Sequence, residues 1–297
     1  MTEIFLVGAT GSLGSRIAAG LLREKARVRA LVRPQSSGSE QVRALVGQGL
    51  DIVEGTLADP TEQLAQAMAG AEVVVSAVQG DADVIVQGQA NLLRAAEKAG
   101  VPRLIPSDFA IDLFRLDDGD NVFLDHRRAA HEAFAGTHVA VTSVLNGAFV
   151  EVMTAPFLEI VDWEAGTFGY WGDGEQPCDF TTIADTAAYT VAVALDPGSA
   201  GRPIRVAGDV LSMKEFHAAL ERGTGRRLRL HRHGSVDDLA AEIERRRATA
   251  SHPAQYVALQ YTWGMVSGKG KLDPLDNDRY PAVRPVSVTE FARRIAF

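Results

Sequence analysis

A glycine-rich stretch near the amino terminus, residues 8–14, constrains the fold of this chain more than any other part of its sequence. It reads Gly-Ala-Thr-Gly-Ser-Leu-Gly, follows the apolar run 4–7 and precedes apolar residues at helical spacing. In such a strand–loop–helix unit the glycines permit a tight turn, close approach of the backbone to a pyrophosphate, and close helix packing. The helix amino terminus adds free N–H groups and partial positive charge. This context favours a phosphate-binding loop over a glycine turn without a ligand. The expected contacts are Gly8, Thr10, Gly11, Ser12, Leu13 and Gly14.

The first half of the chain alternates short apolar runs with helical patterns. Strands are predicted at residues 4–7, 28–32, 51–54, 72–78, 103–105 and 139–144, and a helix at 91–99. Strands that alternate with helices form a parallel sheet covered on both faces and joined by right-handed crossovers. The sequence therefore predicts an α/β fold. A Rossmann doubly wound parallel sheet occupies residues 1–150, and a smaller, mostly helical C-terminal substrate region occupies residues 151–297.

Three shorter segments carry local signals within this organisation. Residues 34–39 are rich in turn formers and are predicted to form a loop. Asp173-Gly174 lies between strand-like residues, which predicts a hairpin around residues 171–174. Residues 203–207 have the pattern of a last strand, and we expect them to return to the main sheet.

The end of the second strand bears on the choice between NAD(H) and NADP(H). An acidic residue there would bind the ribose 2′-hydroxyl, whereas an arginine accommodates a 2′-phosphate. Arg33 directly follows this strand, and no acidic residue appears before Glu40. With Ser36 and Ser37, Arg33 is expected to form an anion site, so the sequence favours NADP(H). The alternative is that Arg33 is a solvated loop residue.

Composition argues against several classes of partner. The net charge of −8 at pH 7 disfavours nucleic acid, and we interpret the basic clusters 226–229 and 245–247 as solvated faces. Cys178 is the single cysteine, so it forms no internal disulfide; no ligand cluster surrounds it, and we expect a packing residue and no metal. No apolar run approaches the ~20 residues that span a bilayer, and we find no signal peptide. We therefore expect a cytoplasmic protein that binds no membrane.

Further motifs carry a family resemblance. Residues 103–109 read Arg-Leu-Ile-Pro-Ser-Asp-Phe, and residues 143–149 read Ser-Val-Leu-Asn-Gly-Ala-Phe. Gly-Asp-Gly at 172–174 precedes Thr-Ile-Ala-Asp-Thr-Ala at 182–187, and Tyr-Pro at 280–281 precedes Val-Thr-Glu-Phe at 288–291. With the Thr-Gly of the glycine loop, these segments resemble the NmrA-like and isoflavone reductase-like family of atypical short-chain dehydrogenases/reductases. The resemblance extends over nearly the whole chain.

The resemblance implies further contacts with an NADP(H) cofactor. They are Ser76, Ala77, Val78 and Gln79 after the fourth strand, and Pro106, Ser107, Phe109, Asn146, Gly147 and Phe149 near the nicotinamide. Each position has a structural alternative, because serines also satisfy strand-end backbone groups and phenylalanines also fill cores. Six apolar residues are expected on the substrate side, which suits an aromatic molecule or an ordinary core. They are Phe149, Val152, Met153, Phe157, Trp171 and Phe180.

The catalytic residues of related enzymes are absent. No tyrosine here is followed by lysine in a Tyr-x-x-x-Lys pair, and residues 121–132, where the resemblance implies a catalytic lysine, contain none. His126 or Arg127 takes that place, depending on a one-residue shift in alignment. A histidine can donate a proton near neutral pH, whereas an arginine holds negative charge but is a poor acid. Alternatively, both are surface residues on a basic helix turn.

Two functions from different classes follow. The first, which we favour, is an NADPH-dependent reductase that transfers hydride to a small aromatic, isoflavonoid- or phenylpropanoid-like substrate. The second is an NmrA-like redox sensor that binds NADP(H) without turnover and regulates a protein partner, and the missing lysine favours it. An epimerase or dehydratase is disfavoured because Tyr-x-x-x-Lys is absent.

Overall fold

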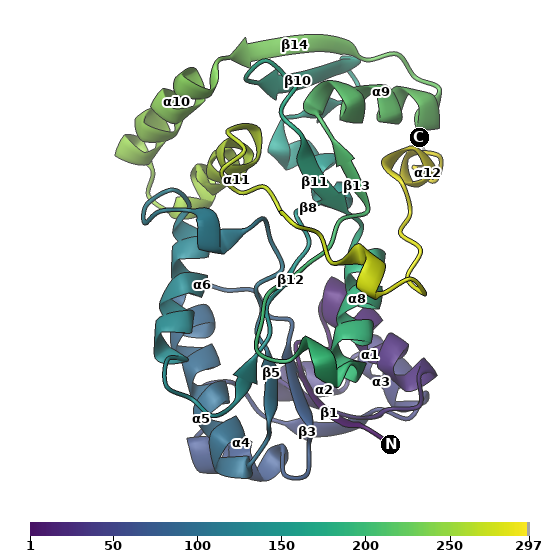
Figure 1. Ribbon diagram of the computed structural model, residues 1–297, viewed down its shortest axis with the longest axis vertical. Coiled ribbons are helices and arrows are strands. Elements are labelled where there is room, and N and C mark those ends of the chain that lie inside the picture. Colours follow the sequence, from purple (N-terminus) through teal and green to yellow (C-terminus); the bar gives the residue numbers. More distant parts are fainter. Residues whose placement is uncertain (296–297) are drawn as a thin grey trace. The chain divides into compact units, whose positions relative to one another are not determined.

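The structure is a computed structural model that describes residues 1–295 (Figure 1), and the chain divides into two compact units. Unit 1 comprises Met1–Phe109, His126–Val144 and Thr186–Ile204, and unit 2 comprises Ala110–Asp125, Leu145–Asp185 and the residues from Arg205 onward. The sequence predicts a single boundary at residue 150, whereas these units are interleaved. The reason is that the chain leaves unit 1 after residue 109 and later returns to add a strand and helical segments. That the two regions bind cofactor and substrate stays a prediction.

Unit 1 is built on a six-stranded sheet in the order β3-β2-β1-β4-β5-β6, in which every neighbouring pair is parallel. Its strands are β1 (Glu3–Val7), β2 (Arg27–Val32), β3 (Asp51–Glu54), β4 (Val73–Ser76), β5 (Arg103–Ile105) and β6 (Ala140–Val141). The chain runs outward from β1 to β3 and then crosses to place β4 on the other side of β1. This reversal confirms the doubly wound α/β fold, and ligands bind such sheets at the carboxyl ends of the strands beside the reversal.

Helices cover both faces of this sheet. They are α1 (Ser12–Arg23), α2 (Pro34–Ser37), α3 (Glu40–Val46), α4 (Thr61–Ala67), η1 (Asp83–Gly88), α5 (Gln89–Ala99), α6 (Val122–Ala133), α8 (Ile183–Leu195) and η4 (Pro197–Ser199), although α6 and α8 begin in unit 2. Figure 1 shows α4, α5 and α6 on one side of the strands, where apolar residues such as Leu64 and Leu92 pack on Phe5. On the other side α1 approaches α8 closely, since a Cβ on Gly20 would lie 2.7 Å from Val191.

The segment predicted as a loop at 34–39 contains a one-turn helix, so that prediction is wrong over residues 34–37. Pro34 occupies the first helical position, where its fixed φ suits a helix and its missing N–H costs nothing. The Ser37 hydroxyl donates back to the Pro34 carbonyl, and the Ser36 N–H donates to the Arg33 carbonyl. One backbone and one side-chain hydrogen bond, both local, therefore close the turn.

Unit 2 combines small sheets with helices around its own core. One sheet has the order β14-β10-β9 and another β13-β11-β8. The strands are β8 (Ala148–Phe149), β9 (Val161–Asp162), β10 (Thr167–Trp171), β11 (Cys178–Thr181), β13 (Asp209–Leu211) and β14 (Arg229–Gly234). The helices are η2 (Leu113–Arg115), α7 (Val150–Met153), η3 (Pro156–Leu158), α9 (Met213–Thr224), α10 (Val236–Thr249), η5 (Pro253–Gln255), α11 (Val257–Val266), η6 (Asn277–Arg279) and α12 (Val288–Ala292). Capping boxes at Ser212, Ser235 and Ser287 begin α9, α10 and α12. Phe168, Phe180 and Phe216 are fully buried at its centre.

Two strand predictions are wrong, because turn signals are local while strand pairing is not. No hairpin forms at residues 171–174, since β10 pairs in parallel with β14 and β11 belongs to a different sheet. The Gly172 N–H donates to the carbonyl of Gly234, the last residue of β14. Residues 203–207 do not return to the main sheet either; β12 (Ile204–Arg205) forms a separate two-stranded ladder with β7 (Val144–Leu145).

A buried carboxyl in unit 2 makes stability depend on pH. Thr182 and the Val286 N–H both donate to Asp185 Oδ2, at 2.6 and 2.9 Å. Burial raises the pKa of Asp185 above its ordinary value of 3.8, although these hydrogen bonds act in the opposite direction. The folded state therefore binds this proton more tightly than the unfolded chain does, and the stability that results is lost as pH rises through the folded pKa.

Asp185→Asn removes this titration. We expect the free energy of unfolding of the variant to rise relative to that of the wild type as pH increases from about 3.8 through the raised pKa. Urea unfolding of both proteins at several values between about pH 3.5 and 6.5 would measure the difference. The expectation would be contradicted if the difference in the free energy of unfolding between the variant and the wild type stayed constant with pH, or if it changed in the opposite sense.

Candidate functional site

The glycine loop lies between the carboxyl end of β1 and the start of α1. Gly8 has φ +89°, and a Cβ there would lie 2.3 Å from the Ala77 carbonyl oxygen; a Cβ on Gly14 would lie 2.1 Å from the Gly8 oxygen. Gly11 differs, because its φ is −83° and its Cβ would meet nothing closer than 3.4 Å. Protein packing therefore demands glycine at positions 8 and 14 but not at position 11.

The first turn of α1 is open to an anion. Gly11 is its N-cap, no side chain of the described residues caps the turn, and the turn contains no acidic residue. Its N–H groups therefore keep the partial positive charge that attracts phosphate. Thr10, Ser12 and Leu13 lie in the same loop or first turn, as the motif predicts.

The carboxyl end of β4 lies beside this loop. Ser76 pairs in register with Val7 and is fully buried, and its Oγ has no hydrogen-bond partner among residues 1–295. Ala77 and Val78 are partly buried and Gln79 is exposed. A buried hydroxyl without a partner is uncommon in proteins. With the open helix turn, it fits a site that a polar ligand completes.

Arg33 lies at the carboxyl end of β2 and is exposed. Ser36 and Ser37 are half-buried in the helical turn that follows. No ion pair involves Arg33 within the described part of the chain. Its guanidinium is therefore available to an external anion.

The segment after β5 is held by side chains from several elements. The Ser107 N–H donates to Gln89 Oε1 at 2.7 Å, and its hydroxyl donates to the Val78 carbonyl at 2.6 Å. Arg127 Nε donates to the Ser107 carbonyl at 2.9 Å. Pro106 and Phe109 are buried on either side. The segments after β4 and after β5, both predicted to contact the cofactor, are thus hydrogen-bonded to each other, and the second is also hydrogen-bonded to α6.

Asp108 is the centre of a polar cluster that sequence reasoning missed. Its carboxylate is fully buried, and Oδ2 lies 2.6 Å from His131 Nε2 and 2.7 Å from the Ser143 hydroxyl. The one available signal was that Arg127 and His131 are four residues apart and therefore share a helix face. Their partners come from distant parts of the chain, which a single sequence does not reveal.

His126 and Arg127 are the two candidates for the position of the catalytic lysine that the family resemblance implies. Both lie on α6 and are partly buried, about 100° apart around the helix axis. Arg127 donates a hydrogen bond from Nε to the carbonyl of Ser107, in the segment after β5. That either residue is catalytic stays a prediction.

The remaining predicted cofactor contacts belong to unit 2. Asn146 is fully buried, and neither polar atom of its side chain has a hydrogen-bond partner among the described residues. Gly147 has φ +69°, and a Cβ there would lie 2.3 Å from the Asp179 oxygen. Phe149 is half-buried at the start of α7. Their role at the nicotinamide stays a prediction.

The residues expected on the substrate side do not share one environment. Met153 and Phe180 are buried core residues, whereas Phe157 is 69% exposed. Burial raises the pKa of Cys178 to about 12, so its thiol stays protonated and the residue packs in the core, as the sequence predicts.

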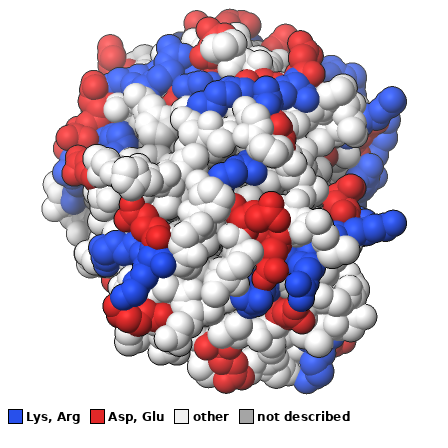
Figure 2. Space-filling view, turned by 60° about the horizontal axis from the view of Figure 1, so that its bottom comes forward, with Lys and Arg blue, Asp and Glu red and all other residues white. Residues whose placement is uncertain are grey.

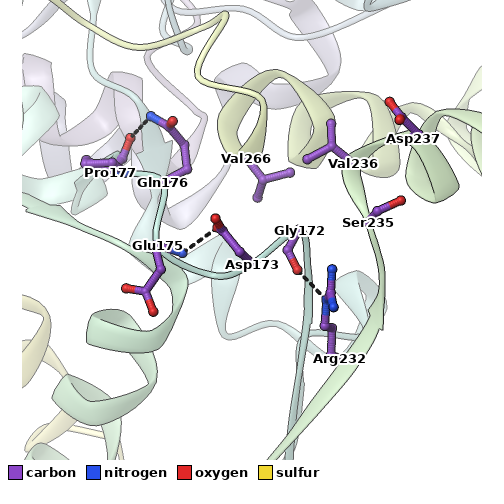
Figure 3. Close-up of a pocket in the computed structure, with 10 residues that line it drawn as sticks. All are labelled: Gly172, Asp173, Glu175, Gln176, Pro177, Arg232, Ser235, Val236, Asp237 and Val266. Carbon is purple, nitrogen blue, oxygen red and sulfur yellow. Dashed lines mark hydrogen bonds between the residues drawn. The ribbon is translucent and has the colours of Figure 1, made fainter.

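A pocket of about 540 Å³ lies entirely within unit 2 (Figure 3). Its lining is Gly172, Asp173, Glu175, Gln176, Pro177, Arg232, Ser235, Val236, Asp237 and Val266. Figure 3 shows Arg232 reaching the Gly172 carbonyl, to which its Nε donates at 2.6 Å. The pocket is more polar than the apolar site expected from the sequence, and it contains none of the six expected residues.

The surface carries mixed charge. Basic and acidic side chains are interspersed on the face drawn in Figure 2. Arg245 and Arg246 pair with Glu242, and Arg247 pairs with Glu244, which is the geometry of a solvated helix face. Among residues 1–295, no cluster of three or more histidine, cysteine or acidic side chains could hold a metal ion. Likewise, no described helix combines the length and apolar character needed to cross a membrane.

Comparison with known proteins identifies relatives along most of the chain. The sequence model of the NmrA-like family matches residues 1–257. Pinoresinol reductase 1 of Arabidopsis thaliana is 29% identical over an alignment of 256 positions that covers 80% of each chain. Isoflavone reductase of Pisum sativum is 24% identical over an alignment of 317 positions that covers 97% of each chain. The solved structure of AtPrR2 with NADP+ and (+)pinoresinol superposes with a TM-score of 0.83 at 23% identity over 98% of each chain.

Proposed function

This chain belongs to the NmrA-like family, and on that premise we propose that it is an NADP(H)-dependent oxidoreductase. The observation that carries the proposal is the loop at Gly11, where the backbone is open and the first turn of α1 is uncapped beside β4. The solved structure of a similar protein with NADP+ supports the choice of cofactor. The family resemblance expected from the sequence is thereby confirmed.

The residues of unit 1 fit the parts of this cofactor. Gly11 and the first turn of α1 receive the pyrophosphate, and Arg33 with Ser36 and Ser37 receives the 2′-phosphate. The Ser76 hydroxyl lies at the carboxyl end of β4, between this loop and the segment at Ser107. Bound NADPH supplies a hydride from C4 of its nicotinamide ring.

The substrate is a small aromatic molecule of the isoflavonoid or phenylpropanoid kind. Relatives named for pinoresinol and isoflavone support this class. His126 donates the proton that reduction consumes, because a protonated imidazole can act as a general acid. Arg127 has a different part, since its bond to the Ser107 carbonyl holds the segment beside the cofactor.

A sensor without turnover is the second candidate. The observation that favours it is the absence of any lysine from residues 121–132. Such a protein would bind NADP(H) with the same loop and change its affinity for a protein partner.

The transfer of deuterium from C4-labelled NADPH tests the proposal. Purified protein would be incubated with the A-face and B-face labels and a panel of isoflavones, lignans, benzylic ethers, enones and quinones. Deuterium in a product, detected by mass spectrometry, would support the reductase and identify its substrate class. Tight binding of NADP(H) without transfer would favour the sensor, and absence of binding would reject both.

Arg33→Ala should reduce the preference for NADPH over NADH by about tenfold or more. The reason is that a charged hydrogen bond to phosphate contributes about 1.5–3 kcal/mol. Dissociation constants for both dinucleotides would be measured by calorimetry. Arg94→Ala, at an exposed position of α5, is the matched control and should change neither. An unchanged ratio in Arg33→Ala would show that the 2′-phosphate binds elsewhere.

A further inference from the structure

Two side chains of α6 hold consecutive residues of the segment that follows β5. Arg127 Nε donates to the Ser107 carbonyl at 2.9 Å, and His131 Nε2 lies 2.6 Å from Asp108 Oδ2. The two residues are one helical turn apart and face the same way. Together they set the register between α6 and this segment.

Of these two contacts, the one at Asp108 involves a buried carboxylate, whereas the one at Ser107 involves a backbone carbonyl. The Asp108 carboxylate is fully buried, and a buried charge is stable only when paired or hydrogen-bonded. Oδ2 accepts from the imidazole and from the Ser143 hydroxyl, which lies 2.7 Å away. Oδ1 has no hydrogen-bond partner within residues 1–295. The position of Asp108 therefore depends on His131 and Ser143.

This cluster is not a nucleophilic triad. Ser143 Oγ and Asp108 Oδ2 both lie next to the same ring nitrogen, His131 Nε2, at 3.3 and 2.6 Å. A serine nucleophile needs the acid on one ring nitrogen and the hydroxyl on the other. Ser143 is also buried, with 2% of its surface exposed. The arrangement holds a segment in place and does not activate a hydroxyl.

Through Ser107 the cluster is connected to the rest of the candidate site. Ser107 bonds to Val78 after β4 and to Gln89 at the start of α5. His126 lies on the same helix α6, next to Arg127 in the sequence and about one and a half turns before His131. A change in the register of α6 would therefore displace His126 relative to both segments assigned to the cofactor.

We propose that His131 and Asp108 are positioning residues for hydride transfer. They hold the segment 106–109 against α6 and so set the geometry between the nicotinamide and the proton donor. The inference rests on the proposed function and adds two residues that touch neither substrate nor cofactor. Ser143 supports the same carboxylate.

Three variants test this role. His131→Phe keeps a ring but loses its N–H, His131→Gln keeps a donor, and Ser143→Ala removes one of the two bonds to Oδ2. His138→Phe is the matched control, because His138 is exposed just beyond α6. For each protein, four quantities would be measured: the melting temperature, the affinity for adenosine 2′,5′-bisphosphate, the fluorescence of bound NADPH, and kcat and KM for a substrate found with the labelled cofactor.

We expect His131→Phe to bind adenosine 2′,5′-bisphosphate as the wild type does, because that fragment does not extend to the nicotinamide. The fluorescence of bound NADPH should shift, and kcat should fall by about tenfold with little change in KM. His131→Gln should recover part of this loss, and Ser143→Ala should show a smaller change in the same direction. If His131→Phe does not fold, the other two variants decide the question by the same readouts.

A lower melting temperature with unchanged fluorescence and kcat would overturn the inference and leave a purely structural cluster. Failure of the proposed function is seen separately, in the wild type. There, NADPH and the adenosine fragment would both fail to bind, or no deuterium would be transferred.

Discussion

Replacing Gly11 by valine should weaken NADPH binding about a hundredfold, or about 2.7 kcal/mol, while the melting temperature stays close to that of the wild type. The backbone at Gly11 has φ −83°, which any residue adopts, and a Cβ there would meet nothing closer than the Gly8 oxygen at 3.4 Å. The protein itself therefore tolerates a side chain. A bound pyrophosphate would not, since it must approach this backbone closely.

The other two glycines of the loop show why Gly11 is the informative position. A Cβ would lie 2.3 Å from the Ala77 oxygen at Gly8 and 2.1 Å from the Gly8 oxygen at Gly14. Substitution there would disturb the fold as well as the ligand. Gly38→Val is the control, because nothing lies within 4 Å of a Cβ at Gly38. Calorimetric titration and thermal unfolding would measure both quantities, and wild-type affinity in Gly11→Val would place the cofactor elsewhere.

His126→Gln should lower kcat for substrate reduction by roughly 10²–10⁴-fold, the usual contribution of general acid catalysis. The affinity for NADPH should stay the same, because the change removes a proton donor and no phosphate contact. Single-turnover transfer of deuterium from labelled NADPH would measure the chemical step directly.

Arg127→Gln is the comparison that separates the two candidates. Its loss frees the Ser107 carbonyl, so we expect weaker NADPH binding together with a smaller fall in kcat than in His126→Gln. His138→Gln, at an exposed site, controls for the loss of a histidine. Undiminished turnover in His126→Gln would exclude it as the proton donor.

The parts of the fold that the sequence predicted are those with local causes. The apolar runs at β1, β2, β3 and β5 coincide closely with the observed strands, and their alternation with helices predicted the parallel sheet. The phosphate loop was found for the same reason, because strand, glycines and helix are contiguous. The predicted strand at 139–144 instead divides into β6 and β7, since the chain turns away after Thr142 to pair with β12.

The errors and omissions have non-local causes. Asp173-Gly174 makes a turn, but which strands flank it depends on β14, some sixty residues later. The cluster of Asp108, His131 and Ser143 joins three segments, and none of them contains a recognisable motif for it. These residues are recognised as a cluster by their burial and their mutual contacts, and both depend on the whole fold.

The interleaving of the two units limits how such a chain can evolve. A cut at residue 150 would leave the first piece without residues 186–204, which belong to unit 1, and would leave the second without 110–125 and 145–149, which belong to unit 2. Neither piece would be a whole unit. An exchange of sequence between related genes at residue 150 would therefore divide both units and transfer neither of them whole.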